Sequence, residues 1–125
     1  MELYLHIGAH RTGSTAFQRI LAKNAQTLAQ GGTAVWGPDE LRARPYFYLP
    51  TKAGFAEGAQ EAYAGDIASV TAQRLVISEE NIIGTMLQNM RSRVFYSDFV
   101  PRLVDYGGLF NATPARIGFA IREYA

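Results

Sequence analysis

Apolar residues along this chain follow two different patterns. Short runs of strand length, rich in apolar residues, stand at residues 3–7, 34–36, 74–78 and 115–121. Between these runs, apolar residues return every three or four positions, which is the spacing of one face of an α-helix. The two clearest helical faces are Phe17, Ile20, Leu21, Ala25 and Leu28, and then Phe55, Ala59, Ala62, Tyr63, Ile67 and Val70. Because strands and helices alternate, the pattern predicts an α/β fold with a parallel β-sheet flanked by helices.

Glycine and proline residues indicate where the predicted elements end. The glycine pair at 31–32 is expected to end the first helix. Residues 44–54 hold two prolines around an aromatic cluster, and they predict a loop. A short helix is expected to begin at Glu80 or Asn81, directly after the third predicted strand.

A further helix is expected around residue 100. Ser97 is its predicted N-cap, and Pro101 falls within its first turn, where a proline is tolerated. The glycine pair at 107–108 is expected to end it. The residues predicted to face inward are Phe99, Val100, Leu103 and Val104.

The first predicted strand runs directly into residues 8–15, which read Gly-Ala-His-Arg-Thr-Gly-Ser-Thr. A strand, a glycine turn and a helix start bring unpaired backbone N–H groups and the positive end of the helix dipole to one point. The spacing of Gly8 and Gly13 matches the loop G-x-x-x-x-G-K-[ST], but Ser14 stands at the lysine position. Arg11 carries the positive charge instead. The segment therefore predicts a phosphate-binding loop.

The run Arg-Thr-Gly-Ser-Thr at 11–15 resembles the 5′-phosphosulfate loop of sulfotransferases that use 3′-phosphoadenosine-5′-phosphosulfate. That family usually has lysine where this chain has Arg11, so the charge is kept while the donor geometry changes. Two later strands extend the resemblance over most of the chain. One is followed by the polar residues 79–81, and the other by Arg122, which matches the arginine that holds the cofactor's 3′-phosphate in the family. The serine that assists this arginine in the family is absent, because the chain stops at Ala125.

The resemblance implies a three-layer sandwich like that of the P-loop nucleoside triphosphate hydrolases. Residues 1–125 are expected to form a single domain, because no repeat or linker divides them. Nothing follows Tyr124 to cover the last strand, so we expect an incomplete sandwich that is the N-terminal part of a longer domain. The alternative is a small protein that covers this surface by self-association as a homo-oligomer.

Sulfuryl transfer, the reaction that the resemblance implies, requires a cation at the leaving phosphate and a base at the acceptor, and residues at the strand ends are placed to supply them. Arg11 is expected to stabilise the charge on the leaving phosphate, and Glu79 to take the acceptor's proton, with Glu80 and His10 as rival bases. Glu79 and Glu80 are equally well explained as acidic residues at a helix start. No metal is expected. The residues expected to bind the cofactor are Gly8, Arg11, Thr12, Gly13, Ser14, Thr15 and Arg122.

Composition narrows the range of partners. Twelve basic and eleven acidic residues give a net charge of +1, so no overall field favours nucleic acid or an anionic membrane. The absence of cysteine excludes disulfides and thiolate chemistry. The run at 3–7 is too short for a secretory signal, and no run approaches the ~20 apolar residues of a membrane span. A cytoplasmic location is the expectation.

Three functions fit these features. The first is a sulfotransferase, or the cofactor-binding portion of one, acting on a hydroxyl of a carbohydrate, a lipid or a small molecule. The second is an ATP- or GTP-dependent P-loop kinase or hydrolase, which Ser14 at the lysine position disfavours. The third is a non-catalytic phosphate-binding module. Magnesium dependence separates the first from the second, and turnover separates the first from the third.

Overall fold

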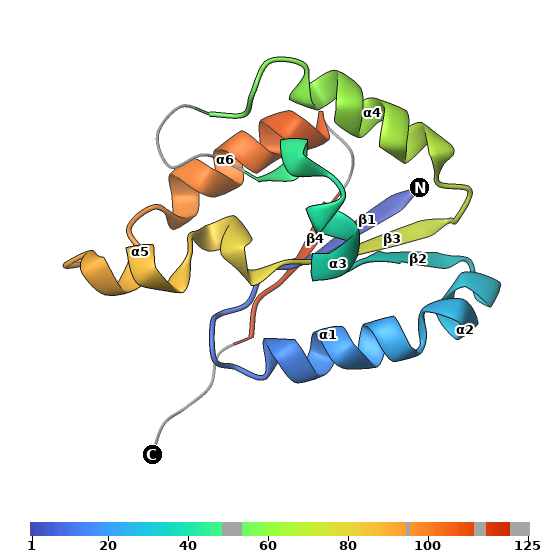
Figure 1. Cartoon of the computed structure of the whole chain (residues 1–125), viewed down its shortest axis with the longest axis horizontal. Helices are drawn as coiled ribbons and strands as arrows, with labels where there is room; N and C mark the ends of the chain where they lie inside the picture. The colour runs from blue at the N-terminus through green and yellow to red at the C-terminus, as the bar shows by residue number, and fades with distance from the viewer. Residues whose placement is uncertain (49–53, 95, 112–114, 121–125) are drawn as a thin grey trace.

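The fold is built on a four-stranded parallel sheet (Figure 1). We describe residues 1–48, 54–94, 96–111 and 115–120 of a computed structural model. The strands are β1 (Glu2–His6), β2 (Thr33–Trp36), β3 (Arg74–Ser78) and β4 (Ala115–Gly118). They pair in the order β2-β3-β1-β4, and every pairing is parallel. The predicted α/β class with a parallel sheet is therefore confirmed.

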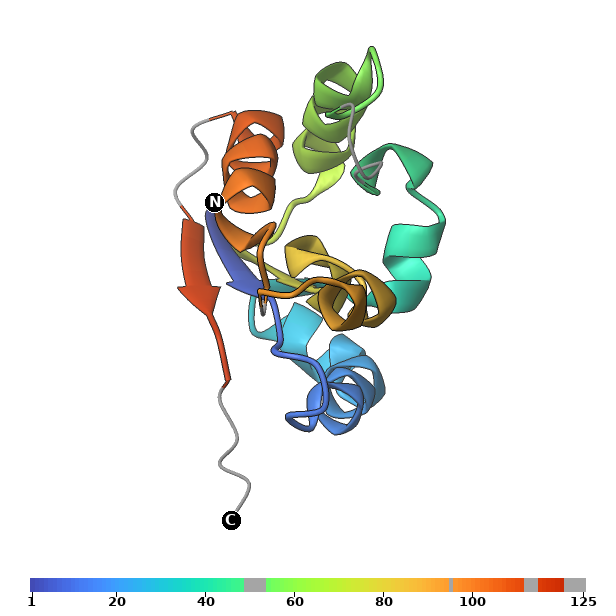
Figure 2. The ribbon, with the colours of Figure 1, turned by 90° about the vertical axis from the view of Figure 1, so that its left-hand side faces the viewer.

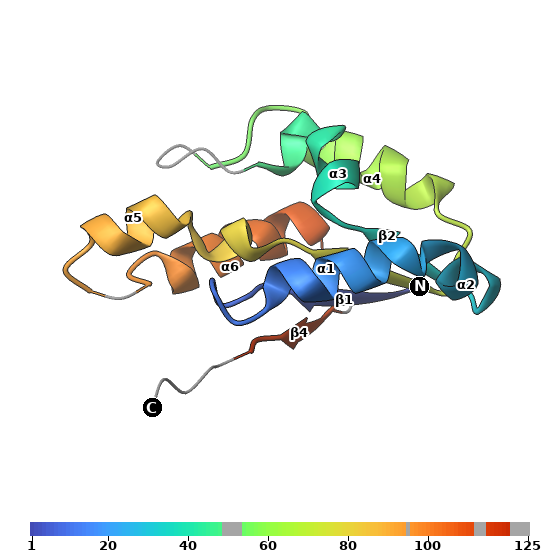
Figure 3. The ribbon, with the colours of Figure 1, turned by 60° about the horizontal axis from the view of Figure 1, so that its bottom comes forward.

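Helices flank both faces of the sheet. Figure 2 shows α1 (Ser14–Lys23) and α2 (Ala25–Gln30) on one side, with α4 (Ala59–Ser69) and α6 (Phe99–Phe110) on the other. Figure 3 shows the same layers with α1 brought forward. The shorter elements are α3 (Pro38–Arg42), α5 (Met86–Arg91) and two 3₁₀ helices, η1 (Pro45–Phe47) and η2 (Glu80–Ile83). Within the described ranges, no helix is long and apolar enough to cross a membrane.

The main core lies between the sheet and the α4–α6 layer. Along β1, Leu3 and Leu5 are buried while Tyr4 and His6 are half-buried, as the alternating pleat of a strand requires. The buried residues of β1 and β3 pack against aromatic rings from η1, α4 and α6. The core cluster comprises Leu3, Leu5, Ile7, Trp36, Leu41, Phe47, Ala59, Tyr63, Leu75, Ile77, Ile82, Ile83, Tyr106, Leu109 and Phe110.

The helix that follows the loop is divided in two. Asn24 ends α1 and begins α2, and its side-chain amide donates to Ile20 O at 2.8 Å. Of the predicted apolar face, the more C-terminal members are half-buried, but Phe17 and Ile20 are 40% and 59% exposed. The predicted end at the glycine pair is confirmed, since α2 ends at Gln30.

The predicted end of the last helix is wrong. Rather than stopping at the glycines 107–108, α6 continues to Phe110 and ends at Asn111, which is left-handed with φ 45°. Leu109 and Phe110 are almost fully buried. Burying two such side chains outweighs the roughly 1 kcal/mol that each glycine costs in a helix.

The predicted inward face of α6 is also partly wrong. Val100 and Val104 are 65% and 68% exposed, because the helix is rotated so that Arg102 and Tyr106 face the interior. The N-cap is Asp98 rather than the predicted Ser97. Phe99 and Leu103 pack against the edge of the core, as predicted.

Three other boundaries differ from the predictions. The second amphipathic helix begins at Ala59 rather than at Phe55. The expected short helix after β3 is two pieces, η2 and α5, and Gly84 with φ +102° lies between them. The expected loop at 44–54 contains η1 in its described part. Arg122 and the end of the last predicted strand lie outside the described residues.

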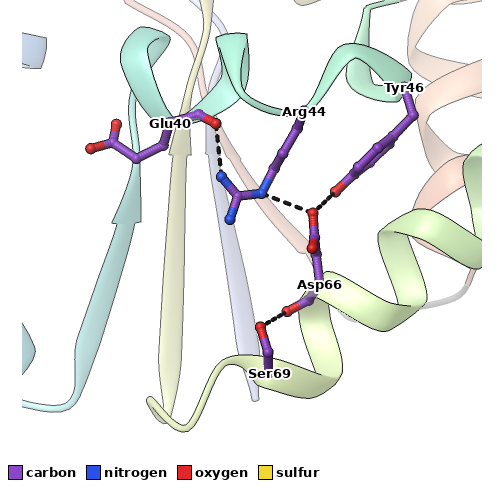
Figure 4. A network of polar contacts seen from close by, with 5 residues as sticks. All are labelled: Glu40, Arg44, Tyr46, Asp66 and Ser69. Atoms are coloured by element: carbon purple, nitrogen blue, oxygen red, sulfur yellow. Dashed lines mark hydrogen bonds and ion pairs between the residues drawn. The ribbon is translucent and has the colours of Figure 1, made fainter.

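A polar network attaches the α3–η1 segment to α4 (Figure 4). The Asp66 carboxylate lies 3.0 Å from Arg44 Nε and accepts a hydrogen bond of 2.6 Å from the Tyr46 hydroxyl. Arg44 also donates to Glu40 O at 2.7 Å, and its guanidinium lies 4.1 Å from the ring centroid of Trp36. Burial and the Asp66 carboxylate raise the pKa of Tyr46. These contacts fix the chain that follows β2.

Leu5 and Ile117 provide a matched test of the core, because they are register partners on neighbouring strands. Leu5 is 4% exposed and Ile117 is 53% exposed. We expect Leu5→Ala to lower the free energy of unfolding by about 2–5 kcal/mol, through lost burial and a cavity. Ile117→Ala should lower it by less than about 1 kcal/mol. Urea unfolding followed by circular dichroism measures both, and equal losses would contradict this burial pattern.

Candidate anion-binding site

The candidate site lies where β1 and β3 end. His6 and Ser78 are register partners, so the turns that follow them start side by side. Gly8 fits closely against Glu80: a Cβ added to Gly8 would lie 3.3 Å from Glu80 Cβ, and its φ is +102°. The positive φ favours glycine here, and a side chain would also require Glu80 to shift. The loop after β1 and the turn after β3 therefore form one surface.

The loop after β1 is folded around the carbonyl of Ala9. The Thr12 hydroxyl donates to Ala9 O at 2.6 Å, and the buried Ser14 hydroxyl approaches the same oxygen at 3.3 Å. Arg11 and Gly13 are left-handed, with φ 61° and 91°. Ser14 is one of the residues expected to bind the cofactor, but its hydroxyl is directed at Ala9 O within the loop. Contact between Ser14 and a ligand would therefore be made through its backbone amide.

The loop ends at the start of α1, where a run of amides finds no acceptor among the described residues. Gly13 is the N-cap, and Gly13 O accepts from Phe17 N at 3.0 Å. Within the described part of the chain, nothing is hydrogen-bonded to the amides of residues 12–16. Arg11, Gly13 and Thr15 are exposed, so solvent reaches this region. Free amides at the positive end of a ten-residue helix favour an anion.

Glu79 is a buried carboxylate beside this loop. It is 4% exposed and accepts a hydrogen bond of 2.9 Å from Asn81 N. Burial raises the pKa of Glu79, and the negative charge of Glu80 raises it further, while the Asn81 contacts and His10 lower it. Glu79 is also the N-cap of η2, so the helix-start interpretation of this residue holds as well. A carboxylate with a raised pKa is a better proton acceptor than an ordinary one.

His10 connects the loop with the turn after β3. Its backbone N–H donates to the Tyr96 hydroxyl at 3.1 Å, and its Nδ1 lies 3.3 Å from the same oxygen. Its Nε2 lies 3.4 Å from Asn81 Oδ1. The structure thus brings His10, Arg11 and Glu79 to one edge of the sheet, whereas Arg122 lies outside the described residues.

Sequence reasoning missed Arg102. This arginine of α6 is 9% exposed, and it donates to Ile82 O at 2.8 Å and to Asn81 O at 3.0 Å. It holds the turn that carries Glu79 and Asn81. The sequence could have indicated its burial, because Arg102 lies one helical turn before Tyr106 and the two residues therefore share one face of α6.

Sequence reasoning also missed Tyr96, whose hydroxyl contacts His10. No periodicity indicates it, because the residue lies in a turn rather than in a helix or strand. Its φ of 53° is unusual for a side chain of this size, and the sequence gives no sign of that conformation.

The second histidine, His6, contacts residues next to the site. His6 Nδ1 lies 2.8 Å from Ser78 Oγ, and the His6 ring meets the Phe17 ring edge-on at a centroid distance of 4.6 Å. Burial lowers the pKa of His6, and the Glu80 charge opposes this. Ser78 is fully buried, so the pair joins the strand ends to α1 rather than facing solvent.

A cavity of about 490 Å³ adjoins the loop on its β2 side. Thr15, Gln18 and Arg19 of α1 form one wall, and residues 37–40 with Arg42 form the other. Gln18 Nε2 donates to Ser78 O at 3.4 Å, so this wall is attached to the end of β3. The cavity is large enough for a small ligand group.

The three aromatic residues at 46–48 lie in three different environments. Tyr46 packs locally against Asp66, and Phe47 is in the core. Burial and the negative charge of Glu79 raise the pKa of Tyr48, so this ring belongs to the surroundings of Glu79.

Comparison with protein-family models, curated proteins and solved structures found no match. The case for a function therefore depends on the residues and geometry of the site.

Glu79→Gln should make the protein more stable at neutral pH. A folded-state pKa above the unfolded value means that stability falls as pH rises from the unfolded pKa through the folded one. The neutral amide avoids this loss and still accepts from Asn81 N. The stability difference between Glu79→Gln and wild type should therefore grow from acidic to neutral pH. Urea unfolding at a series of pH values measures it, with Glu57→Gln at an exposed position before α4 as the control. A difference independent of pH would contradict the raised pKa.

Proposed function

We propose that this chain binds 3′-phosphoadenosine-5′-phosphosulfate and takes part in transferring its sulfuryl group to a hydroxyl acceptor. The observation that carries the proposal is the run of amides at residues 12–16, which lacks acceptors in the described part of the chain and begins α1. Arg11 in the same loop supplies a fixed positive charge. The resemblance of residues 11–15 to the sulfotransferase loop supports the choice of ligand, and with it a P-loop-like fold.

The chemistry requires a cation at the leaving group and a base at the acceptor. The acceptor oxygen attacks sulfur, and the bond from sulfur to the 5′-phosphate oxygen breaks, which leaves 3′-phosphoadenosine-5′-phosphate. Arg11 and the loop amides stabilise the charge that grows on that phosphate. The acceptor's proton passes to the Glu79 carboxylate. The raised pKa of Glu79 supports this role, since it makes the carboxylate a stronger base.

We assign the acceptor to the cavity beside Thr15. It adjoins the loop, and Gln18 in its wall is hydrogen-bonded to the end of β3, one residue before Glu79. Its lining combines apolar residues of α1 and α2 with charged residues of α1 and α3. Such a surface suits an acceptor with both hydroxyl groups and apolar faces, as in a sugar or a small alcohol.

Nucleotide binding is the first test. We expect 3′-phosphoadenosine-5′-phosphate to bind the protein without metal, and at least about tenfold more tightly than ATP does. The physical reason is that Ser14 cannot supply the charge that a P-loop lysine directs at a terminal phosphate. Isothermal titration calorimetry with both nucleotides, with and without magnesium, measures this. Tighter, magnesium-dependent binding of ATP would favour a kinase or hydrolase instead.

Arg11 is the second test. Arg11→Ala should weaken binding of 3′-phosphoadenosine-5′-phosphate about 10- to 100-fold, because it removes a charge-assisted contact. Arg11→Lys should keep most of the affinity, since lysine carries the same charge. Arg74→Ala is a matched control, because it removes the same charge from the start of β3, at the opposite end of the strand from the site. Equal affinities of Arg11→Ala and Arg74→Ala would show that Arg11 does not contact the nucleotide.

A further inference from the structure

Tyr96 is held in an unusual conformation at the candidate site. It is one of three non-glycine residues with positive φ in the described chain, with Arg11 and Asn111. Asn111 ends α6, which is a common position for this conformation. Arg11 is part of the loop after β1, and Tyr96 contacts that loop through the bond between its hydroxyl and His10. Strained backbone at a functional site is retained where its side chain has a task.

The contacts of Tyr96 determine where its hydroxyl proton goes. The His10 backbone N–H donates to the Tyr96 oxygen at 3.1 Å, so one lone pair of that oxygen is used. His10 Nδ1 lies 3.3 Å from the same oxygen, within reach of its hydroxyl proton. The two rings lie nearly parallel, with an interplanar angle of 11°. An Nδ1 that accepts the Tyr96 proton carries none of its own, so the ring's proton then lies on Nε2.

The other side of the imidazole agrees with this assignment. His10 Nε2 lies 3.4 Å from Asn81 Oδ1, an oxygen that can only accept. The backbone of Asn81 is held by Arg102 and by the Glu79 carboxylate. Asn81 therefore favours a proton on Nε2, and the Tyr96 hydroxyl favours an Nδ1 without one.

We infer that His10 is a hydrogen-bond donor at this site, not its base, and that Tyr96 is the positioning residue that fixes the donor tautomer. At 3.4 Å the contact with Asn81 is weak, so an incoming oxyanion can replace it. A ring that already holds its proton at Nε2 and is occupied at Nδ1 does not accept the acceptor's proton, which leaves that role to Glu79. The identity of the oxyanion, a phosphate or sulfuryl oxygen of the nucleotide, rests on the proposed function.

Imidazole ¹⁵N spectra of the full chain test the tautomer without any ligand. The chain has two histidines, so His6→Gln assigns the signals of His10. In mildly alkaline buffer, we expect His10 to show a protonated Nε2 and an unprotonated Nδ1. Tyr96→Phe should shift these signals toward a mixture of tautomers. Tyr106→Phe is the matched control, because it removes a buried hydroxyl that donates to Phe47 O within the core. A proton on Nδ1 in the wild type, or unchanged signals in Tyr96→Phe, would overturn the inference.

The donor role is tested with two substitutions at His10. The amide of His10→Gln offers an N–H near the place of Nε2, whereas His10→Ala offers none. We expect His10→Ala to bind 3′-phosphoadenosine-5′-phosphate about tenfold more weakly than wild type, and His10→Gln to recover at least half of that loss on a logarithmic scale. Equal losses would overturn the donor role while leaving the proposed function in place. Failure of the wild type to bind the nucleotide would overturn the donor role and the proposed function together, and the ¹⁵N spectra would still decide the role of Tyr96.

Discussion

The parallel pairing of β1 with β3 is the constraint on which the candidate site depends. It sets His6 level with Ser78, so two turns more than seventy residues apart in sequence leave the sheet at the same edge. Gly8 and Glu80 then lie so close that a side chain on Gly8 would require Glu80 to shift. A slip of one residue in this register would reverse the faces of Leu3 and Leu5 and would also separate the two turns. The core and the site are therefore specified by the same set of strand contacts.

The second support of the site comes from α6. Its Arg102 is a buried guanidinium that donates to two carbonyls of the turn after β3, and Tyr96, which precedes the helix, contacts the loop after β1. This one segment of the chain thus contacts both the turn after β3 and the loop after β1. Because Leu109 and Phe110 anchor the same helix in the core, packing far from the loop is coupled to the placement of Asn81.

The sequence was sufficient for the parts of the structure that depend on local patterns. Apolar runs located the strands, and the spacing of Gly8 and Gly13 located the turn before α1. Sequence was insufficient where packing overrides local preference. The glycines at 107–108 read as a helix end, but burial of the two following side chains extends α6. The exposed valines of α6 and the buried Arg102 show that the rotation of a helix is set by tertiary contacts. The Tyr96 contact depends on a turn conformation that no periodicity encodes.

The hydrogen bonds of Thr12 and Ser14 to Ala9 O have a consequence for molecular recognition. They form within the loop itself, so the loop keeps its curvature before any ligand arrives. An anion that binds there would meet a preorganised surface, and little conformational entropy would be lost on association. Affinity at such a loop would then depend mainly on how completely the amides and the cation replace the water around the ligand.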